Sequence, residues 1–318
     1  MSDLTLILDR RELVVRMEAQ TVCIERAGLM PQKVPLRMIG RVIAIGNPMV
    51  SCGVWRALAE KNIPVVLLPS RGKGGVAYLG SGLSGAVENR MAHYRAAHDK
   101  SCALAMCRRL ICMKLKGQER VLGQLDPDSE GGASLKIIRK CRADLEKADT
   151  RDQIMGLEGA AAAAYFRTWK KQLPRKWGFS GRNRRPPKDP VNALLSLGYV
   201  IAGSEVRSVI QKRGLDPALG ILHAPKPVRD SFVLDILEPI RPLVDEFVLG
   251  LLDNPIQLKH FSPSHNDGCL LNKEGRKAFY QAWAGWLEPD EDQETLRSVA
   301  KKVVREMVNL FIGHSAGC

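Results

Sequence analysis

The spacing of apolar residues changes once along this chain, from a pattern typical of strands to one typical of helices. Over about the first 80 residues, short runs rich in β-branched residues alternate with turn residues, as in LTLILD, ELVVRME, TVCIERAG and GRVIAIG. From Val87 onward, apolar residues recur at steps of three and four instead. The chain therefore predicts an α+β fold, in which a small N-terminal β-rich domain precedes a larger all-helical domain.

Turn residues and helix caps place the boundaries within this plan. We expect the β-rich domain at 1–80, a linker at 81–88 and the helical domain at 89–318. PMVSCGVWRALAEKN predicts one helix inside the first domain, and the glycine- and serine-rich stretch at 69–85 predicts a hairpin that leads into the linker. Thr150 and Gln153 form a capping box. Further helices are expected at 133–147, 191–213, 231–252, 273–287 and 294–311.

The charge balance narrows the class of partner. The chain has 48 Lys and Arg against 34 Asp and Glu, a formal net charge of +14. We place nucleic acid ahead of a membrane surface, because no basic helix with a clean apolar face stands out. Weak attraction to any polyanion is the alternative. The sequence has no run of about 18 apolar residues and no secretory signal pattern, so no spanning helix is expected.

The cysteines point away from a zinc protein. None of the eight belongs to a C-x-x-C pair or has zinc-ribbon spacing. Cys102, Cys107 and Cys112 recur every five residues, which rotates them around a helix, so we expect apolar core residues in a reducing cytoplasm. Walker A, dinucleotide, H-E-x-x-H and G-x-S-x-G motifs are also absent from the sequence.

The segment LDPALGILHAPKPVRDSFVLDILEPIRP, from Leu215 to Pro242, brings a histidine close to two carboxylates. Asp235 and Glu238 are three residues apart and share one helical face, which His223 can meet from the preceding turn. Nitrogen and oxygen ligands of this kind suit manganese or magnesium better than structural zinc. The alternative is an ordinary histidine beside a solvated helix face.

Two features near Glu238 bear on this hypothesis. Glu238 lies at the border of an apolar stripe, which is typical of a residue that lines a cleft, and Arg241 could neutralise a phosphate there. Pro239 and Pro242 should kink the helix or end its regular turn, which could aim Glu238.

A further carboxylate, Glu158, stands in the segment GLEGAAAAAYF. It lies between Gly156 and Gly159 and precedes five alanines. Another backbone or a ligand can approach a carboxylate closely on a helix with such small side chains. The alternative is that the helix is tightly packed and that Glu158 is merely exposed at its start.

The stretch RTWKKQLPRKWGFSGRNRRPPKDP predicts a surface that holds DNA. Trp169, Trp177 and Phe179 are interleaved with cations, so cations could contact phosphates while aromatic faces stack on bases. A solvated basic loop is the alternative. The eight basic residues, with no acid among them, are Lys170, Lys171, Arg175, Lys176, Arg182, Arg184, Arg185 and Lys188.

In DPVNALLSLGY, three polar side chains fall on one helical face. Asn192, Ser196 and Tyr199 are spaced i, i+4 and i+7. They could orient the metal ligands or substrate phosphates by hydrogen bonds, without binding the metal themselves. A polar stripe that faces solvent is the alternative. Five other histidines have no partner at ligand spacing and stay unassigned: His93, His98, His260, His265 and His314.

Six segments taken in order resemble the CRISPR-associated integrase family, the larger of the two proteins of spacer acquisition. They are VPLRMIGRVIAIGN…ALAEKNIPVVLL, ENRMAHYRAA, GLEGAAAAAYF, DPVNALLSLGY, GLDPALGILH and SFVLDILEPIRPLVD. The resemblance implies an N-terminal β domain that dimerises and an all-helical catalytic domain that binds Mg²⁺ or Mn²⁺. By motif, it makes Glu158, His223 and Glu238 the catalytic metal ligands, with Asp235 as a helper or alternative ligand.

The resemblance also implies a reaction and partners. A 3′-hydroxyl of a spacer would attack a phosphodiester of a CRISPR repeat, and water in its place would give endonuclease activity. The partners would be double-stranded DNA (spacer precursor and repeat), a second copy of the chain, and the smaller universal adaptation protein in a heterohexamer. The setting would be the prokaryotic cytoplasm, with no membrane. The alternatives are a transposon-type integrase of the same fold and a non-catalytic DNA-binding scaffold.

Overall fold

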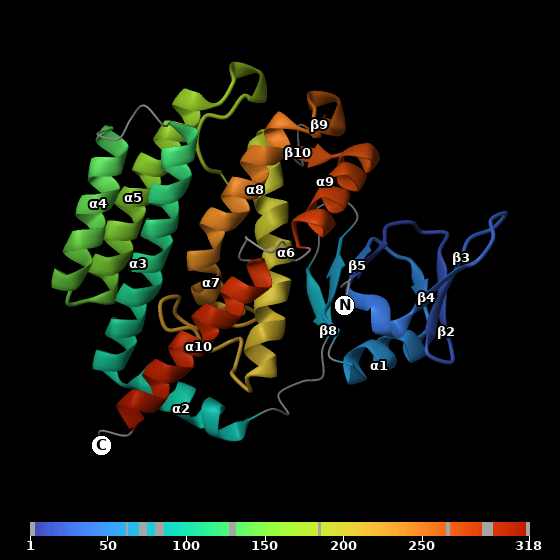
Figure 1. Cartoon of the computed structure of the whole chain (residues 1–318), viewed down its shortest axis with the longest axis horizontal. Coiled ribbons are helices and arrows are strands. Elements are labelled where there is room, and N and C mark those ends of the chain that lie inside the picture. The colour runs from blue at the N-terminus through green and yellow to red at the C-terminus, as the bar shows by residue number, and fades with distance from the viewer. Residues whose placement is uncertain are drawn as a thin grey trace.

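A computed structural model of the chain describes residues 4–61, 63–69, 75–79, 86–126, 132–183, 186–264, 268–287 and 295–315. Its strands lie mostly in an N-terminal region and its helices in the region that follows (Figure 1). This arrangement confirms the predicted α+β class. The boundaries at 80 and 88 stay a prediction, since residues 80–85 lie outside the described part of the chain.

The strand-rich region consists of two four-stranded sheets that share a hydrophobic core with α1 (Cys52–Glu60). The first sheet is parallel except for its last, antiparallel pair, in the order β1 (Leu4–Leu8), β5 (Ile39–Ile45), β7 (Val65–Leu68) and β8 (Ala77–Leu79). The second has the order β4 (Gln32–Pro35), β3 (Thr21–Glu25), β2 (Val14–Glu18) and β6 (Met49–Val50). Strand β8 lies inside the stretch 69–85 where a hairpin was expected and pairs with β7 just before it, but residues 70–74 and 80–85 of that stretch lie outside the described part of the chain.

Strand β5 connects the two regions because both of its faces are buried. Val42 and Ala44 face the core of the strand-rich region, whereas Ile43 and Ile45 belong to the core of the helical region. Successive side chains of a strand point to opposite faces. A strand covered on both sides therefore reads as a continuous apolar run, as the sequence VIAI does.

The helical region is built around a bundle of long helices, in which α3, α4 and α5 lie side by side (Figure 1). Its helices are α2 (Val87–His98), α3 (Lys100–Leu125), α4 (Ala133–Asp144), α5 (Arg151–Gln172), α6 (Pro190–Lys212), α7 (Ser231–Leu237), α8 (Arg241–Asp253), α9 (Lys273–Trp286) and α10 (Leu296–Ser315). Short 3₁₀ helices are η1 (Leu36–Met38), η3 (Leu145–Lys147), η4 (Arg175–Trp177), η5 (Glu238–Ile240) and η6 (Leu258–His260). A two-stranded sheet pairs β9 (Phe261–Ser264) with β10 (Gly268–Leu271), so the prediction that this region is all-helical is wrong in this detail.

Local signals in the sequence explain where several helices begin and end. The Thr150 side chain accepts a hydrogen bond from the Gln153 N–H, and the capping box is complete. Asp99 caps α3 by accepting from the Cys102 N–H at 2.7 Å, which divides the helical stretch after residue 87 into α2 and α3. Sequence analysis missed this cap, and it also missed β4 and β6, which are too short to show a pattern.

Helix α6 runs through the middle of the helical region. Contrary to the sequence-based expectation, it is long and apolar enough to cross a membrane by length and composition. However, 72% of its most apolar window is buried inside the protein. This burial is typical of a central core helix.

A buried ion cluster joins the two regions. Glu205 of α6 is 1% exposed, and its carboxylate lies 3.1 Å from Arg41 Nη1 of β5 and 3.2 Å from Arg297 Nη2 of α10. A buried charge is tolerated only when opposite charges compensate it in place. Glu205 therefore fixes β5 against two helices that are distant in sequence.

The variant Glu205→Gln tests this connection. It removes a buried negative charge that lies between two arginine guanidinium groups, so the free energy of unfolding should fall by about 3–5 kcal/mol. Glu306→Gln is the control, because Glu306 pairs with Arg109 at a partly exposed position, where a loss of about 0–1 kcal/mol is expected. Urea denaturation followed by circular dichroism measures both. Equal losses in the two variants would contradict the structural role of the cluster.

His93 of α2 is a fully buried histidine. Its ring centroid lies 4.3 Å from that of Phe232 on α7 and 5.0 Å from that of Phe311 on α10. Burial lowers the pKa of His93 to about 4, although the charge of Asp216 opposes the shift. This histidine, left unassigned from the sequence, is a neutral core residue.

The depressed pKa of His93 predicts acid sensitivity. The unfolded chain binds a proton at this ring below about pH 6.5, whereas the folded protein binds it only near pH 4. Protonation of His93 therefore leaves the free energy of unfolding unchanged above pH 6.5. As the pH falls from 6.5 toward 4, the same group lowers that free energy by up to about 3 kcal/mol. In urea denaturation between pH 7.5 and 4, His93→Leu should lose less stability than the wild type. Parallel curves for the two proteins would refute this prediction.

Candidate active site

Two of the predicted carboxylates converge on a lysine that sequence analysis missed. Lys114 of α3 is 5% exposed, and its Nζ donates a hydrogen bond to Glu158 Oε1 of α5 and, at 2.5 Å, to Glu238 Oε2 of η5. The three residues come from three separate elements. An available signal was the position of Lys114 on α3, where it falls four residues after Leu110 on the buried face.

Asp235 organises the turn that carries His223. Fully buried, its carboxylate accepts hydrogen bonds from the backbone N–H groups of Ile221, Leu222 and His223, at 2.5, 3.0 and 2.8 Å. Its Oδ1 also lies 2.7 Å from His223 Nδ1. A carboxylate can only accept there, so Nδ1 carries the proton and the lone pair of Nε2 is available as a ligand. Burial raises the pKa of Asp235, while His223 and the backbone donors oppose that shift.

This arrangement gives Asp235 a supporting position. Sequence analysis left open whether it is a helper or an alternative ligand. Its two oxygens already accept from four donors in the turn, which matches the role of a helper. The turn also depends on Gly220: a Cβ there would lie 2.3 Å from the His223 carbonyl oxygen and 2.5 Å from Ser231 Cβ.

Two prolines and a glycine place Glu238. The helix breaks as predicted, since Pro239 and Pro242 accompany the 3₁₀ turn η5 between α7 and α8. Pro242 packs against Gly117 of α3, where a Cβ would lie 2.8 Å from the proline ring. Gly117 is three residues from Lys114 on the same helix, so this close approach brings Glu238 to the lysine.

Glu238 is more enclosed than the sequence suggested. Its predicted place was the border of an apolar stripe, but the side chain is buried. Arg241 Nε donates to its Oε1 at 2.9 Å, so Arg241 is committed to this carboxylate. Burial raises the pKa of Glu238, but the charges of Arg241 and Lys114 outweigh this and hold the pKa well below its usual range.

The polar face of α6 points inward. Asn192 and Tyr199 are buried, so the alternative of a solvent-facing stripe is wrong. Asn192 Oδ1 accepts from Arg182 Nη1 at 2.7 Å, and Ser196 Oγ accepts from Arg182 Nη2 at 3.3 Å. The face therefore anchors the basic loop at Arg182.

Tyr199 belongs to a buried network that the sequence did not reveal. Its hydroxyl and that of Tyr165 both donate to Asp245 of α8. Burial raises the pKa of Asp245 to about 6, against the effect of the two hydroxyl donors. The Arg241 guanidinium lies 4.6 Å from the centroid of the Tyr199 ring, which connects this network to Glu238.

The basic segment is divided between surface and core. The aromatic part of the prediction is wrong: Trp169, Trp177 and Phe179 are buried in the core and cannot stack on bases. Arg182 is half-buried against α6. Arg184 and Arg185 lie outside the described residues. The exposed cations of the predicted set are Lys170, Lys171, Arg175, Lys176 and Lys188.

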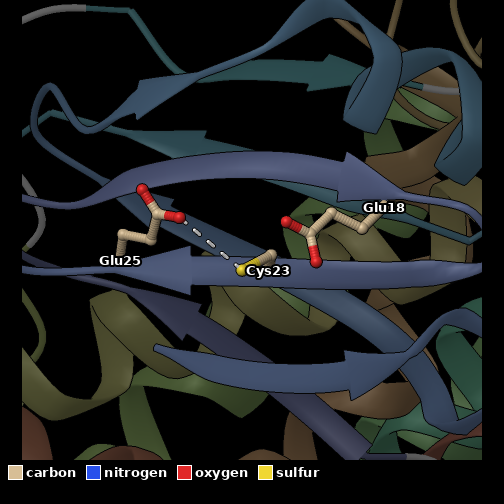
Figure 2. A group of neighbouring side chains, drawn as sticks. All are labelled: Glu18, Cys23 and Glu25. Carbon is tan, nitrogen blue, oxygen red and sulfur yellow. Dashed lines mark hydrogen bonds between the residues drawn. The ribbon is translucent and has the colours of Figure 1, made fainter. Parts of the chain in front are cut away.

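A second cluster of ligand-type side chains lies in the strand-rich region. Figure 2 shows Glu18, Cys23 and Glu25 on neighbouring strands, with the Cys23 Sγ 3.9 Å from Glu25 Oε1. Arg16 lies 3.0 Å from Glu18 and 2.6 Å from Glu25, and Lys33 lies 2.9 Å from Glu18. The cluster is therefore a network of ion pairs in the strand-rich region, apart from the carboxylates and histidine that the sequence predicts as ligands.

The donor set of the helical region fits a hard divalent cation. Two carboxylates and one imidazole with a free Nε2 are ligands for Mg²⁺ or Mn²⁺. The ammonium of Lys114 already lies between Glu158 and Glu238, so the two side chains are arranged for a cation. Among the described residues, the ligand atoms of Glu158, His223 and Glu238 do not all lie within 4.8 Å of one another.

Sequence comparison gives one consistent result. The profile of the family described as "CRISPR associated protein Cas1" matches residues 6–285. A protein of Rhodospirillum rubrum named CRISPR-associated endonuclease Cas1 2 is 35% identical over 288 residues, which are 85% of this chain and 82% of that protein.

Solved structures share the fold. A Cas1 protein from Thermotoga maritima has a TM-score of 0.84 at 23% identity, over 97% of each chain. A chain of a Cas6-RT-Cas1–Cas2 complex has a TM-score of 0.82 at 22% identity, over 98% of this chain and 35% of that one. A casposase bound to its integration product has a TM-score of 0.81 at 22% identity, over 97% of this chain and 91% of that one.

Replacing Asp235 by asparagine tests how the turn is held. An amide keeps one acceptor oxygen but turns a donor toward groups that are themselves donors, so stability should fall by about 2–4 kcal/mol. Nδ1 of His223 should also lose its fixed proton, which nitrogen-15 NMR of the ring reports. Asp253→Asn, at the exposed end of α8, is the control and should change stability by about 0.5 kcal/mol at most. An unchanged ring tautomer in Asp235→Asn would contradict this account.

Proposed function

The chain belongs to the CRISPR-associated Cas1 family, and we propose that it is a metal-dependent DNA endonuclease and integrase of CRISPR adaptation. The observation that carries the proposal is the convergence of Glu158 and Glu238 on one cation position, and the contact of His223 Nδ1 with Asp235 leaves Nε2 of that ring as the third ligand atom. The name of the Rhodospirillum rubrum relative supports nuclease chemistry. The likeness to a casposase with an integration product is consistent with strand transfer on this fold.

The proposed reaction is a transfer between phosphodiesters. The oxygen of a spacer 3′-hydroxyl loses its proton and bonds to a repeat phosphorus, while the bond from that phosphorus to the repeat 3′-oxygen breaks and this oxygen takes up a proton. Water in place of the hydroxyl gives hydrolysis. Mg²⁺ or Mn²⁺ would supply charge stabilisation at the phosphate when bound by Glu158, His223 and Glu238.

The protein's own residues prepare this site. Asp235 fixes the tautomer and orientation of the His223 ring, so that Nε2 rather than Nδ1 is offered. Arg241 holds the Glu238 carboxylate in the ionised form that a ligand needs. Binding energy from DNA contacts elsewhere then positions the reacting hydroxyl and phosphate.

The exposed cations of the basic segment are the proposed DNA contacts. Lys170, Lys171, Arg175, Lys176 and Lys188 are on the surface, in a chain of net charge +14. Such contacts bind phosphates without reading the sequence, so binding should weaken steeply as salt rises. Arg182 is not among these contacts, because its side chain faces α6 and joins the basic segment to that helix.

The proposed assembly follows from family membership. Residues 1–80 would form the dimerisation domain and 89–318 the catalytic domain, with 81–88 between them. A homodimer would join the smaller universal adaptation protein in a heterohexamer on double-stranded spacer precursor and repeat DNA, in the prokaryotic cytoplasm. The Cas1–Cas2 complex that contains a chain of this fold is consistent with such a partner.

A transposon-type integrase is the second candidate, and the likeness to a casposase is the observation that favours it. The two functions would share the site and differ in the DNA that is inserted. A neighbouring repeat array and inserts of spacer length would identify CRISPR adaptation, whereas insertion of a long element would identify a transposon enzyme.

Strand transfer into a supercoiled plasmid that carries a repeat tests the site. Glu158→Gln and His223→Ala should each lower the rate by about 100-fold or more, because several kcal/mol of charge stabilisation at the phosphate is lost. Glu246→Gln, which changes a carboxylate in a surface pair with Arg120, should retain the rate. DNA binding measured by fluorescence anisotropy should be retained in all three. Unchanged strand transfer in both site variants would overturn the assignment of the site, whereas a wild-type protein that binds DNA without transferring a strand would favour a non-catalytic scaffold.

A further inference from the structure

Every oxygen of Glu238 is already bonded to a cation of the protein. Its Oε2 accepts from Lys114 Nζ at 2.5 Å, and its Oε1 accepts from Arg241 Nε at 2.9 Å. Lys114 also donates to Oε1 of Glu158. A divalent cation therefore reaches Glu238 only at an oxygen that a side-chain cation already occupies.

The charges in this cluster balance without any added ion. The two carboxylates of Glu158 and Glu238 face the ammonium of Lys114 and the guanidinium of Arg241, and Lys114, Glu238 and Arg241 are nearly enclosed. A divalent cation would add two positive charges to these four groups, and the nearby Asp245 carboxylate, whose charge acts on Arg241 and Lys114, offsets one of them at most. Repulsion between like charges is strong where water is largely excluded.

Lys114, unlike Arg241, can move away from the carboxylates when a divalent cation binds. Arg241 is held from a second side by the ring of Tyr199, with its guanidinium 4.6 Å from the ring centroid. Lys114 is a point charge on a flexible four-carbon stem, and its Nζ donates hydrogen bonds to the two carboxylates themselves. The ammonium and an incoming cation thus compete for the same oxygens.

We propose that Lys114 is a positioning residue that sets the divalent-cation affinity of this site. Its ammonium holds Glu158 and Glu238 together in the cation-free protein and leaves at least one of them when a cation binds. The inference rests on the proposed function, because it takes these carboxylates as the cation ligands. By linkage, a group that stabilises the cation-free state weakens cation binding by the same free energy.

This competition has a consequence that a purely structural lysine would not have. Loss of the ammonium leaves two carboxylates facing each other, so the cation-free protein becomes less stable. A divalent cation then relieves more repulsion and binds more tightly. A lysine needed only for packing would, when removed, lower stability and either weaken cation binding or leave it unchanged.

Titration of Mn²⁺ into chelator-treated protein, with free Mn²⁺ counted by electron paramagnetic resonance, tests the inference. Lys114→Met keeps the length of the side chain and removes its charge; it should lower the Kd for Mn²⁺ by about tenfold, within the usual range of coupling between sites. Its melting temperature in chelator should fall below that of the wild type. Lys116→Met removes an exposed charge from the same helix and should change neither value.

A second variant keeps the test decisive if Lys114→Met does not fold. Lys114→Gln is neutral but keeps hydrogen-bond donors for the carboxylates, and it too should bind Mn²⁺ more tightly than the wild type. A Kd equal to or higher than that of the wild type in Lys114→Gln, or in folded Lys114→Met, overturns the inference alone. A wild-type protein that binds neither Mn²⁺ nor Mg²⁺ overturns the proposed metal dependence instead, so the two failures are distinguishable.

Discussion

A carboxylate cannot remain ionised inside a protein unless donors or cations compensate it in place, and this requirement shapes the structure. The helical region buries several acids and compensates each in a different way. Those with their partners are Asp235 with three backbone N–H groups and His223, Glu238 with Lys114 and Arg241, Asp245 with two tyrosine hydroxyls, and Glu205 with Arg41 and Arg297. Asp235 holds a turn 12–14 residues before it, whereas the other three sets join elements that are far apart in the sequence. These polar contacts thus tie together elements that the apolar core also packs against one another.

The candidate active site lies where the contacts of Asp235 and those of Glu238 come together. Asp235 and Glu238 lie one turn apart where α7 ends, so the first holds the histidine turn and the second faces α3. The close contact of Pro242 with Gly117 brings that turn against the lysine of α3. Glu158 of α5, a helix that packs beside α3 in the bundle, is the second carboxylate at the Lys114 ammonium. A cation position between packed helices is rigid, which catalysis by positioning requires.

Sequence analysis predicted the parts of this site that local patterns encode. The capping box at Thr150, the proline break after Glu238 and the histidine turn all depend on residues within a few positions of one another. Lys114 could not be predicted in this way, since its partner Glu238 is 124 residues distant. Periodicity identified the buried face of α3, but not which acid would meet a lysine on that face. The same limit explains the error at Trp169 and Trp177: basic neighbours suggested a surface, whereas tertiary packing buries the rings.

The central claim is that Glu158, His223 and Glu238 hold one divalent cation in a DNA integrase of the Cas1 family. Anomalous diffraction from crystals grown with Mn²⁺ tests it most directly, because the ion is located without reference to activity. We predict one strong peak within about 2.0–2.3 Å of an oxygen of each glutamate and of Nε2 of the histidine. A peak at Glu18, Cys23 and Glu25, with none at the helical site, would contradict the account.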